Sequence, residues 1–202
     1  MTLHLRRETQ ASPAMHKSLG LNALLDWMRG DRSYAILDLG PAVGGNVRFW
    51  SQFSCCLHIC DFYRSYREWK AAAGPQEESA EAAFSELLPF HDEMVFDIIL
   101  AWDLFNYFEL RELEALVQRL CRWCHPETRL FALISSLPNI SVSPTIFRII
   151  NRERLLYEIP TQETKPGPCY QPRDIARLMA RFTVSSSFLL RQGIREYVFA
   201  FQ

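Results

Sequence analysis

Residues 34–45, with the sequence YAILDLGPAVGG, join an apolar segment to a glycine turn. The segment 34–40 has the short apolar character of a strand that is covered on both faces. Gly40 permits a tight turn at its end, and the small residues Ala42 and Gly44 let a ligand approach the main chain. The residues NVRFWSQF that follow can start a helix. The stretch predicts a strand, a glycine turn and a helix.

The unit repeats once. Residues 57–61, LHICD, predict a second strand, and the aromatic residues that follow predict a second helix. Asp61 lies 21 residues after Gly40, at the carboxyl end of this strand. A carboxylate there can accept both ribose hydroxyls of a nucleoside. Gly40 and Asp61 together predict a nucleoside pocket.

The rest of the chain continues the alternation of strands and helices. Further strands are expected at 83–90, 96–102, 129–135, 183–190 and 194–201, and helices near 110–120 and 172–182. The last two strands are too close for a crossover helix and are therefore antiparallel neighbours. We expect an α/β fold: a Rossmann-like, mostly parallel seven-stranded sheet with helices on both faces and an antiparallel terminal strand.

All 202 residues are expected to form one domain. Within it, residues 1–33 are expected to be a helical cover. Residues 136–171 contain five prolines, interrupt the pattern and predict a substrate-side insertion. Within this insertion, the sequence of residues 146–159 favours a hairpin over a short helix.

Composition narrows the classes of partner. With 22 basic and 23 acidic residues the net charge is -1, which indicates neither a nucleic acid nor a membrane partner. A cytoplasmic location is expected, since the first residues are polar and no apolar stretch is long enough for a membrane span. The six cysteines are interpreted as reduced thiols, and no metal site is expected.

These motifs resemble those of the class I S-adenosylmethionine-dependent methyltransferase family. Asp38, Gly40 and Gly44 match its first motif, with Ala42 in place of the middle glycine, and Asp61 matches its second acidic residue. Residues 87–108 are similar to the stretch leading through a proline turn into strand four. The resemblance covers about 19–202 and implies S-adenosylmethionine as cofactor. It implies methyl transfer to a small-molecule or exposed peptide acceptor.

The chain departs from the family at two places. Phe84 stands where many relatives have an aspartate that contacts the adenine amine, which leaves Ser85 or Glu86 as substitutes. The two-proline motif of amine methylation is absent after strand four. This absence weighs against nucleobase amines and glutamine side chains as acceptors.

The candidate site residues follow from the resemblance and from their place at the ligand edge. Asp103 and Tyr107 directly follow strand four and are the candidate catalytic residues. Asp103 would orient or deprotonate a hydroxyl or amine, or alternatively cap the next helix. The expected cofactor-binding residues are Asp38, Gly40, Ala42, Gly44, Asp61, Phe62, Glu86, Ala101 and Trp102.

Two other functions stay open. A non-catalytic binding or assembly module is compatible with the missing middle glycine and the missing adenine aspartate. An NAD-dependent oxidoreductase is compatible with the spacing of Gly40, Ala42 and Gly45, although the close terminal hairpin disfavours it.

Overall fold

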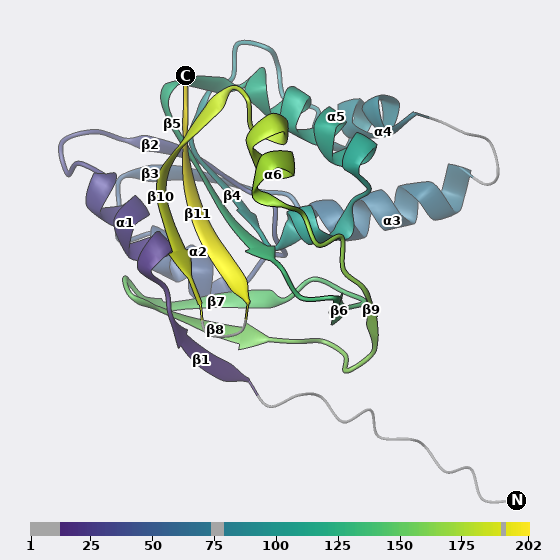
Figure 1. The fold of residues 1–202 in the computed structure, drawn as a ribbon. Helices are drawn as coiled ribbons and strands as arrows, with labels where there is room; N and C mark the ends of the chain where they lie inside the picture. Colours follow the sequence, from purple (N-terminus) through teal and green to yellow (C-terminus); the bar gives the residue numbers. More distant parts are fainter. Residues whose placement is uncertain (1–12, 74–78, 191–192) are drawn as a thin grey trace, which may run out of the picture.

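The computed structural model describes residues 13–73, 79–190 and 193–202, and a six-stranded mixed sheet lies at its centre. The strand order is β10-β11-β5-β4-β2-β3 (Figure 1). The strands are β2 Tyr34–Asp38, β3 Cys55–Ile59, β4 Phe96–Trp102, β5 Cys124–Ser135, β10 Phe182–Leu189 and β11 Ile194–Phe201. The first four are parallel, while β11 is antiparallel to both β5 and β10. The predicted α/β class and the antiparallel end of the sheet are confirmed.

The prediction of a seventh strand at 83–90 is wrong. These residues belong mainly to helix α4, Ala80–Leu87, and to the turn after it. The Ser79 side chain caps the helix by accepting a hydrogen bond from the amide of Ala82 at 3.3 Å. Ala83, Phe84 and Leu88 are buried, which gives the helix one apolar side. A short apolar run does not distinguish a buried strand from such a helix.

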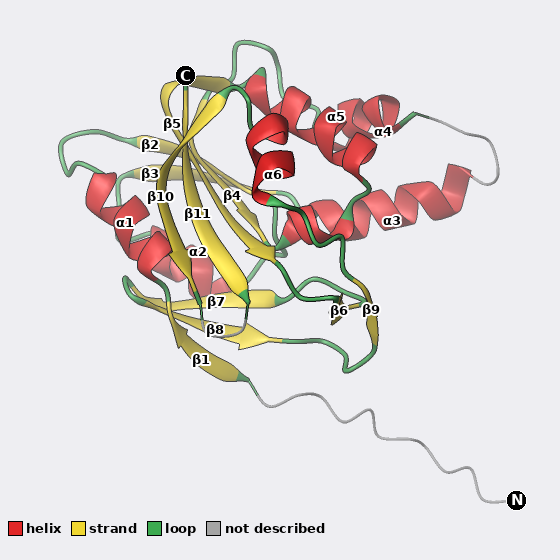
Figure 2. Ribbon diagram, in the orientation of Figure 1, coloured by secondary structure: helices red, strands yellow, loops and turns green. Residues whose placement is uncertain are grey.

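Helices cover both faces of the sheet, as predicted (Figure 2). On one face lie α1 Leu19–Trp27 and α2 Gly44–Trp50, and on the other α3 Phe62–Ala73, α4, α5 Leu110–Cys121 and α6 Pro172–Leu178. Each face has its own apolar cluster. Leu24 and Trp50 belong to the first, and Phe84, Leu116 and Ile175 to the second. A single turn of 3-10 helix, Leu104–Tyr107, follows β4.

Two small sheets lie below the main one in Figure 1. β7 Ile146–Asn151 and β8 Arg154–Glu158 form the hairpin predicted in the insertion, and β1 Ala14–Lys17 pairs with β8. β6 Asn139–Ser141 pairs with β9 Thr164–Pro166. The expected helical cover at 1–33 is thus a strand followed by a helix where it is described. Four residues carry too little pattern to predict β1, whose pairing depends on β8.

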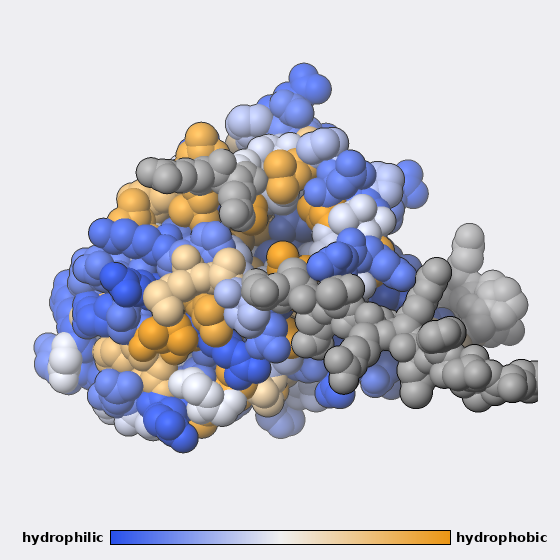
Figure 3. All heavy atoms as spheres, turned by 90° about the horizontal axis from the view of Figure 1, so that it is seen from below, coloured by the Kyte–Doolittle hydropathy of each residue, from blue (hydrophilic) through white to orange (hydrophobic). Residues whose placement is uncertain are grey.

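The three-stranded sheet has an inner and an outer face. Phe147, Leu155 and Tyr157 are buried against the cluster that contains α1 and α2. The side seen in Figure 3 mixes hydrophilic and hydrophobic residues, and Met15 and Ile150 of these strands are about half exposed. None of the helices in the described ranges has the length and apolar character needed to cross a membrane.

Candidate functional site

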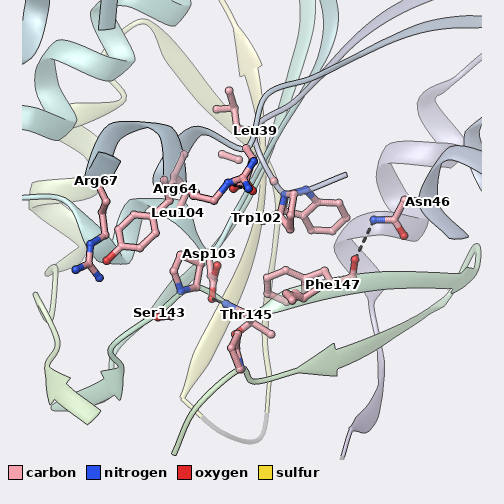
Figure 4. A pocket seen from close by; sticks show the side chains of 18 of the residues that line it. Leu39, Asn46, Arg64, Arg67, Trp102, Asp103, Leu104, Ser143, Thr145 and Phe147 are labelled. Atoms are coloured by element: carbon pink, nitrogen blue, oxygen red, sulfur yellow. Dashed lines mark hydrogen bonds and ion pairs between the residues drawn. The ribbon is translucent and has the colours of Figure 1, made fainter. Parts of the chain in front are cut away.

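A cavity of about 440 Å³ lies at the carboxyl ends of β2, β3 and β4. Ser143, Thr145 and Phe147 of the insertion lie on its opposite side (Figure 4), and Pro144, Ile146 and Pro160 also line it. Its walls consist of Leu39, Gly40, Pro41, Asn46, Asp61, Tyr63, Arg64, Arg67, Glu68, Ala101, Trp102, Asp103, Leu104, Ser143, Pro144, Thr145, Ile146, Phe147 and Pro160. Open parallel sheets bind ligands at this edge, so this cavity is the candidate site.

The glycine turn after β2 is held by a buried carboxylate. Asp38 Oδ1 accepts hydrogen bonds from the amide of Gly40 at 2.9 Å and from Trp102 Nε1 at 2.6 Å. Burial raises the pKa of Asp38 to about 6, although both hydrogen bonds act in the opposite direction. A Cβ on Gly40 would lie 2.9 Å from Trp102 Cδ1. The turn therefore requires glycine because the indole lies against it.

Trp102 forms one apolar wall of the cavity. Its backbone φ of 50° is in the left-handed region, which is unusual for a bulky residue. Its ring stacks on Phe147, with centroids 5.2 Å apart and planes at 9° (Figure 4). The stack and the hydrogen bond to Asp38 fix the indole between the glycine turn and the insertion.

Asp61 contributes a carboxylate to the same cavity. Its side chain is 26% exposed, and Oδ2 pairs with Arg64 Nε at 3.0 Å. A carboxylate has two oxygens and about four acceptor sites. Asp61 therefore has acceptor capacity left for two hydroxyl donors.

Asp103 is a second carboxylate in the wall, and it is almost fully buried. Its Oδ2 accepts a hydrogen bond from the amide of Thr145 at 2.9 Å. Burial raises the pKa of Asp103 to about 7, although the hydrogen bonds it accepts lower it. A carboxyl group with this pKa can both accept and release a proton near neutral pH.

Core side chains bind the backbone of residues 142–149, here called the insertion strip. Tyr107 Oη donates to the carbonyl of Ser143 at 2.9 Å, and Asp103 accepts from Thr145. Asn46 makes two bonds: Nδ2 donates to the carbonyl of Phe147 at 2.9 Å, and Oδ1 accepts from the amide of Ile149 at 2.8 Å. These bonds fix the strip as the outer wall of the cavity.

Three solved structures resemble this fold over most of their length. A protein from Pyrococcus horikoshii OT3 aligns with a TM-score of 0.53 and 17% identity, covering 89% of this chain and 86% of that one. An S-adenosylmethionine-dependent methyltransferase from Methanosarcina mazei aligns with a TM-score of 0.51 and 13% identity, covering 89% of this chain and 96% of that one. The glycopeptide N-methyltransferase MtfA in complex with S-adenosyl-L-homocysteine aligns with a TM-score of 0.50 and 10% identity, covering 91% of this chain and 89% of that one.

The chain has a class I S-adenosylmethionine-dependent methyltransferase-like fold. No protein-family model matches the sequence, and no curated protein matches it either. At these identities the similarity extends to the fold alone.

Five of the predicted site residues line the cavity of this methyltransferase-like fold. They are Gly40, Asp61, Ala101, Trp102 and Asp103. Asp38 lies behind the glycine turn and contacts Gly40 and Trp102 instead. The structure thus brings predicted residues that lie at or just after the carboxyl ends of β2, β3 and β4 together around one cavity.

The other predicted residues are not in its lining. Ala42 and Gly44 are exposed, and Phe62 is buried near Tyr66 and Phe84. Glu86 is on α4, where it accepts a hydrogen bond from Trp69 Nε1 at 3.0 Å. The remaining one, Tyr107, lies in an adjoining cavity with Lys165.

Several lining residues were not predicted as site residues. Asn46 is one of them, because a lone asparagine in a helix gives no sign that it binds a strand about one hundred residues away. Arg64 and Arg67 are another case. Their spacing of three on α3 places them on one side of the helix, but it is also typical of a solvated surface.

Proposed function

We propose that the protein binds S-adenosylmethionine in this cavity and transfers its methyl group to an acceptor bound against the insertion strip. The observation that carries the proposal is that Asp61, two residues after β3, lines the same cavity as the Gly40 turn after β2. This combination suits a nucleoside whose ribose hydroxyls donate to Asp61.

The residues present fit such a ligand. The volume of about 440 Å³ is within the range of small-molecule sites, and Trp102 and Phe147 supply apolar walls. Asp103 adds a carboxylate that would favour a nearby cation. When bound, the cofactor supplies an activated methyl group on a positively charged sulfur.

The protein's own contribution would be alignment, exclusion of water and removal of one proton. Methyl transfer from a sulfonium depends mainly on holding the nucleophile in line with the methyl carbon. The insertion strip would hold the acceptor, and Asp103 would take the proton of an amine or hydroxyl. Because Tyr107 donates to Ser143, we assign it to positioning the strip.

We also propose that the insertion selects the acceptor, a small molecule or an exposed peptide group. Residues 143–147 and Pro160 are not part of the main sheet, yet they form one side of the cavity. A loop that covers a ligand edge is suited to choosing among substrates.

One contact favours a second candidate, a binding module without turnover. The Trp102 indole lies against Gly40 and donates to Asp38, so it covers one side of the glycine turn. A ligand that required this surface would have to displace the ring. The two functions differ in turnover but share the nucleoside ligand.

Calorimetric titration of the whole chain with S-adenosylmethionine, S-adenosylhomocysteine and NAD tests the proposal. We expect 1:1 binding of the first two and no binding of NAD. Binding of NAD alone would refute it. Production of S-adenosylhomocysteine with a panel of small amines, alcohols and peptides then separates the enzyme from the module.

A further inference from the structure

The part of the cavity lining that α3 contributes, here called the entrance, is exposed and charged. Helix α3 contributes Arg64, Arg67 and Glu68 to the lining. Arg64 is paired with Asp61, whereas Arg67 makes no ion pair within the described residues. In Figure 4 Arg67 lies on the opposite side of the cavity from Trp102. Its guanidinium is thus available at the entrance.

A second cation lies beside it. Lys165 of β9 is part of the adjoining cavity, and its Nζ is 4.9 Å from the centroid of the Tyr107 ring. Burial lowers the pKa of Lys165, and so does the positive charge of Arg67. Across the described residues no carboxylate lies within 4.0 Å of Lys165 Nζ. An anion placed between the two positive charges would be attracted to both of them.

The acidic residues near Lys165 are engaged elsewhere. Glu112 accepts hydrogen bonds from Lys70 Nζ at 2.8 Å and from Tyr66 Oη at 2.7 Å. Glu109 caps the first turn of α5 through its side chain. These contacts hold the two carboxylates away from direct pairing with Lys165. Other carboxylates also line the two cavities. Asp61 pairs with Arg64, Asp103 and Asp174 accept hydrogen bonds from the amides of Thr145 and Gln171, and Glu68 is exposed.

A pair of tyrosines connects the two cavities. The rings of Tyr63 and Tyr107 are 5.2 Å apart, the Arg67 guanidinium carbon is 6.0 Å from the Tyr63 centroid, and Lys165 contacts Tyr107. The two cations therefore flank the tyrosine pair at one entrance.

We propose that the acceptor carries an anionic group, a carboxylate or a phosphate, that Arg67 binds at this entrance while Lys165 adds to the attraction. The inference rests on the proposed function for its assignment to the acceptor. A guanidinium suits both anions because it can donate two parallel hydrogen bonds to them. The anionic group would orient the acceptor so that its nucleophile points toward Asp103.

The cofactor also has a carboxylate, so the experiment has two arms. In the first, inorganic phosphate is titrated at constant ionic strength into the isotopically labelled full chain and followed by NMR. We expect saturable shifts near Arg67 and Lys165. Arg67→Gln should weaken binding about tenfold and Lys165→Gln about threefold. Arg67→Lys should retain part of the affinity, and the exposed Arg48→Gln on α2 should leave it unchanged. Equal binding by wild type and Arg67→Gln would overturn the inference.

The second arm compares S-adenosylmethionine with 5′-methylthioadenosine, which lacks the carboxylate, in wild type and Arg67→Gln. We expect Arg67→Gln to bind each of the two ligands with the same affinity as wild type does. A selective loss for S-adenosylmethionine would assign the anion site to the cofactor and overturn the inference. Phosphate binding without any binding of S-adenosylmethionine would instead refute the proposed function.

Discussion

Asn46 and Phe147 are 101 positions apart in the sequence, and a 2.9 Å hydrogen bond from Asn46 Nδ2 to the carbonyl of Phe147 joins them (Figure 4). Asn46 Oδ1 also accepts from the amide of Ile149. One buried side chain on α2 thus holds both ends of a short segment of β7. The glycine turn and the insertion are connected through this residue.

Asn46→Ala should lower the free energy of unfolding by about 2–4 kcal/mol, because two buried backbone groups lose their partner. Denaturant unfolding measures the change. Asn22→Ala is the matched control, since Asn22 makes an exposed hydrogen bond to Asp26 and its loss should cost less than about 0.5 kcal/mol. Equal losses of unfolding free energy in the two variants would show that the two hydrogen bonds of Asn46 do not hold β7.

Gly40→Ala should destabilise the protein by about 1–3 kcal/mol, because its Cβ would collide with the Trp102 indole. The collision should disappear when the indole is removed. In a double-mutant cycle with Trp102→Leu, we expect a coupling free energy of about 1 kcal/mol or more. Additive effects of the two substitutions would mean that the ring does not determine the need for glycine.

Asp103→Asn should change how stability depends on pH. Burial raises the pKa of Asp103 in the folded protein to about 7, above the ordinary value of 3.8. The folded state therefore binds more protons than the unfolded state between these two values, and the stability contributed by this group falls as pH rises. The variant lacks this titration, and Asn can still accept from Thr145. Relative to wild type it should gain about 2–4 kcal/mol in unfolding free energy between pH 4 and pH 8.

Unfolding measured across that range for wild type, Asp103→Asn and the exposed control Asp92→Asn tests this. A constant difference between wild type and Asp103→Asn would contradict a raised pKa. The Asp92 variant should show no such gain, because its carboxylate is exposed and paired with Arg122 at the surface.

Local sequence was sufficient to predict the strands that form the ligand edge. The apolar run of β4 and the glycine turn after β2 are determined by residues close together in the chain, and both are where the sequence places them. Asp61 lines the cavity because strands that run parallel end at the same edge.

The features that the sequence did not predict have one physical cause in common. Each of them depends on contacts between residues that are distant in the sequence. The short apolar run at 83–90 fits a buried strand as well as it fits the helix α4, and only the packing of this segment against α3 and α5 decides between the two. The strand β1 depends on β8, and Asn46 depends on β7. Residues 142–145 of the insertion strip have no periodic pattern, and the place of the strip over the cavity follows from side chains of the core.

The affinity of Asp61→Ala for S-adenosylmethionine, compared with wild type by calorimetry, tests the central claim most directly. Loss of a charged acceptor for the ribose hydroxyls should weaken binding by roughly 1.5–3 kcal/mol, or about 10- to 150-fold, while the circular dichroism spectrum stays unchanged. Arg64→Gln is the control, because it removes the partner of Asp61 and leaves the carboxylate in place. Its affinity should equal or exceed that of wild type. Unchanged binding by a folded Asp61→Ala variant would contradict the account, since the nucleoside would then lie elsewhere.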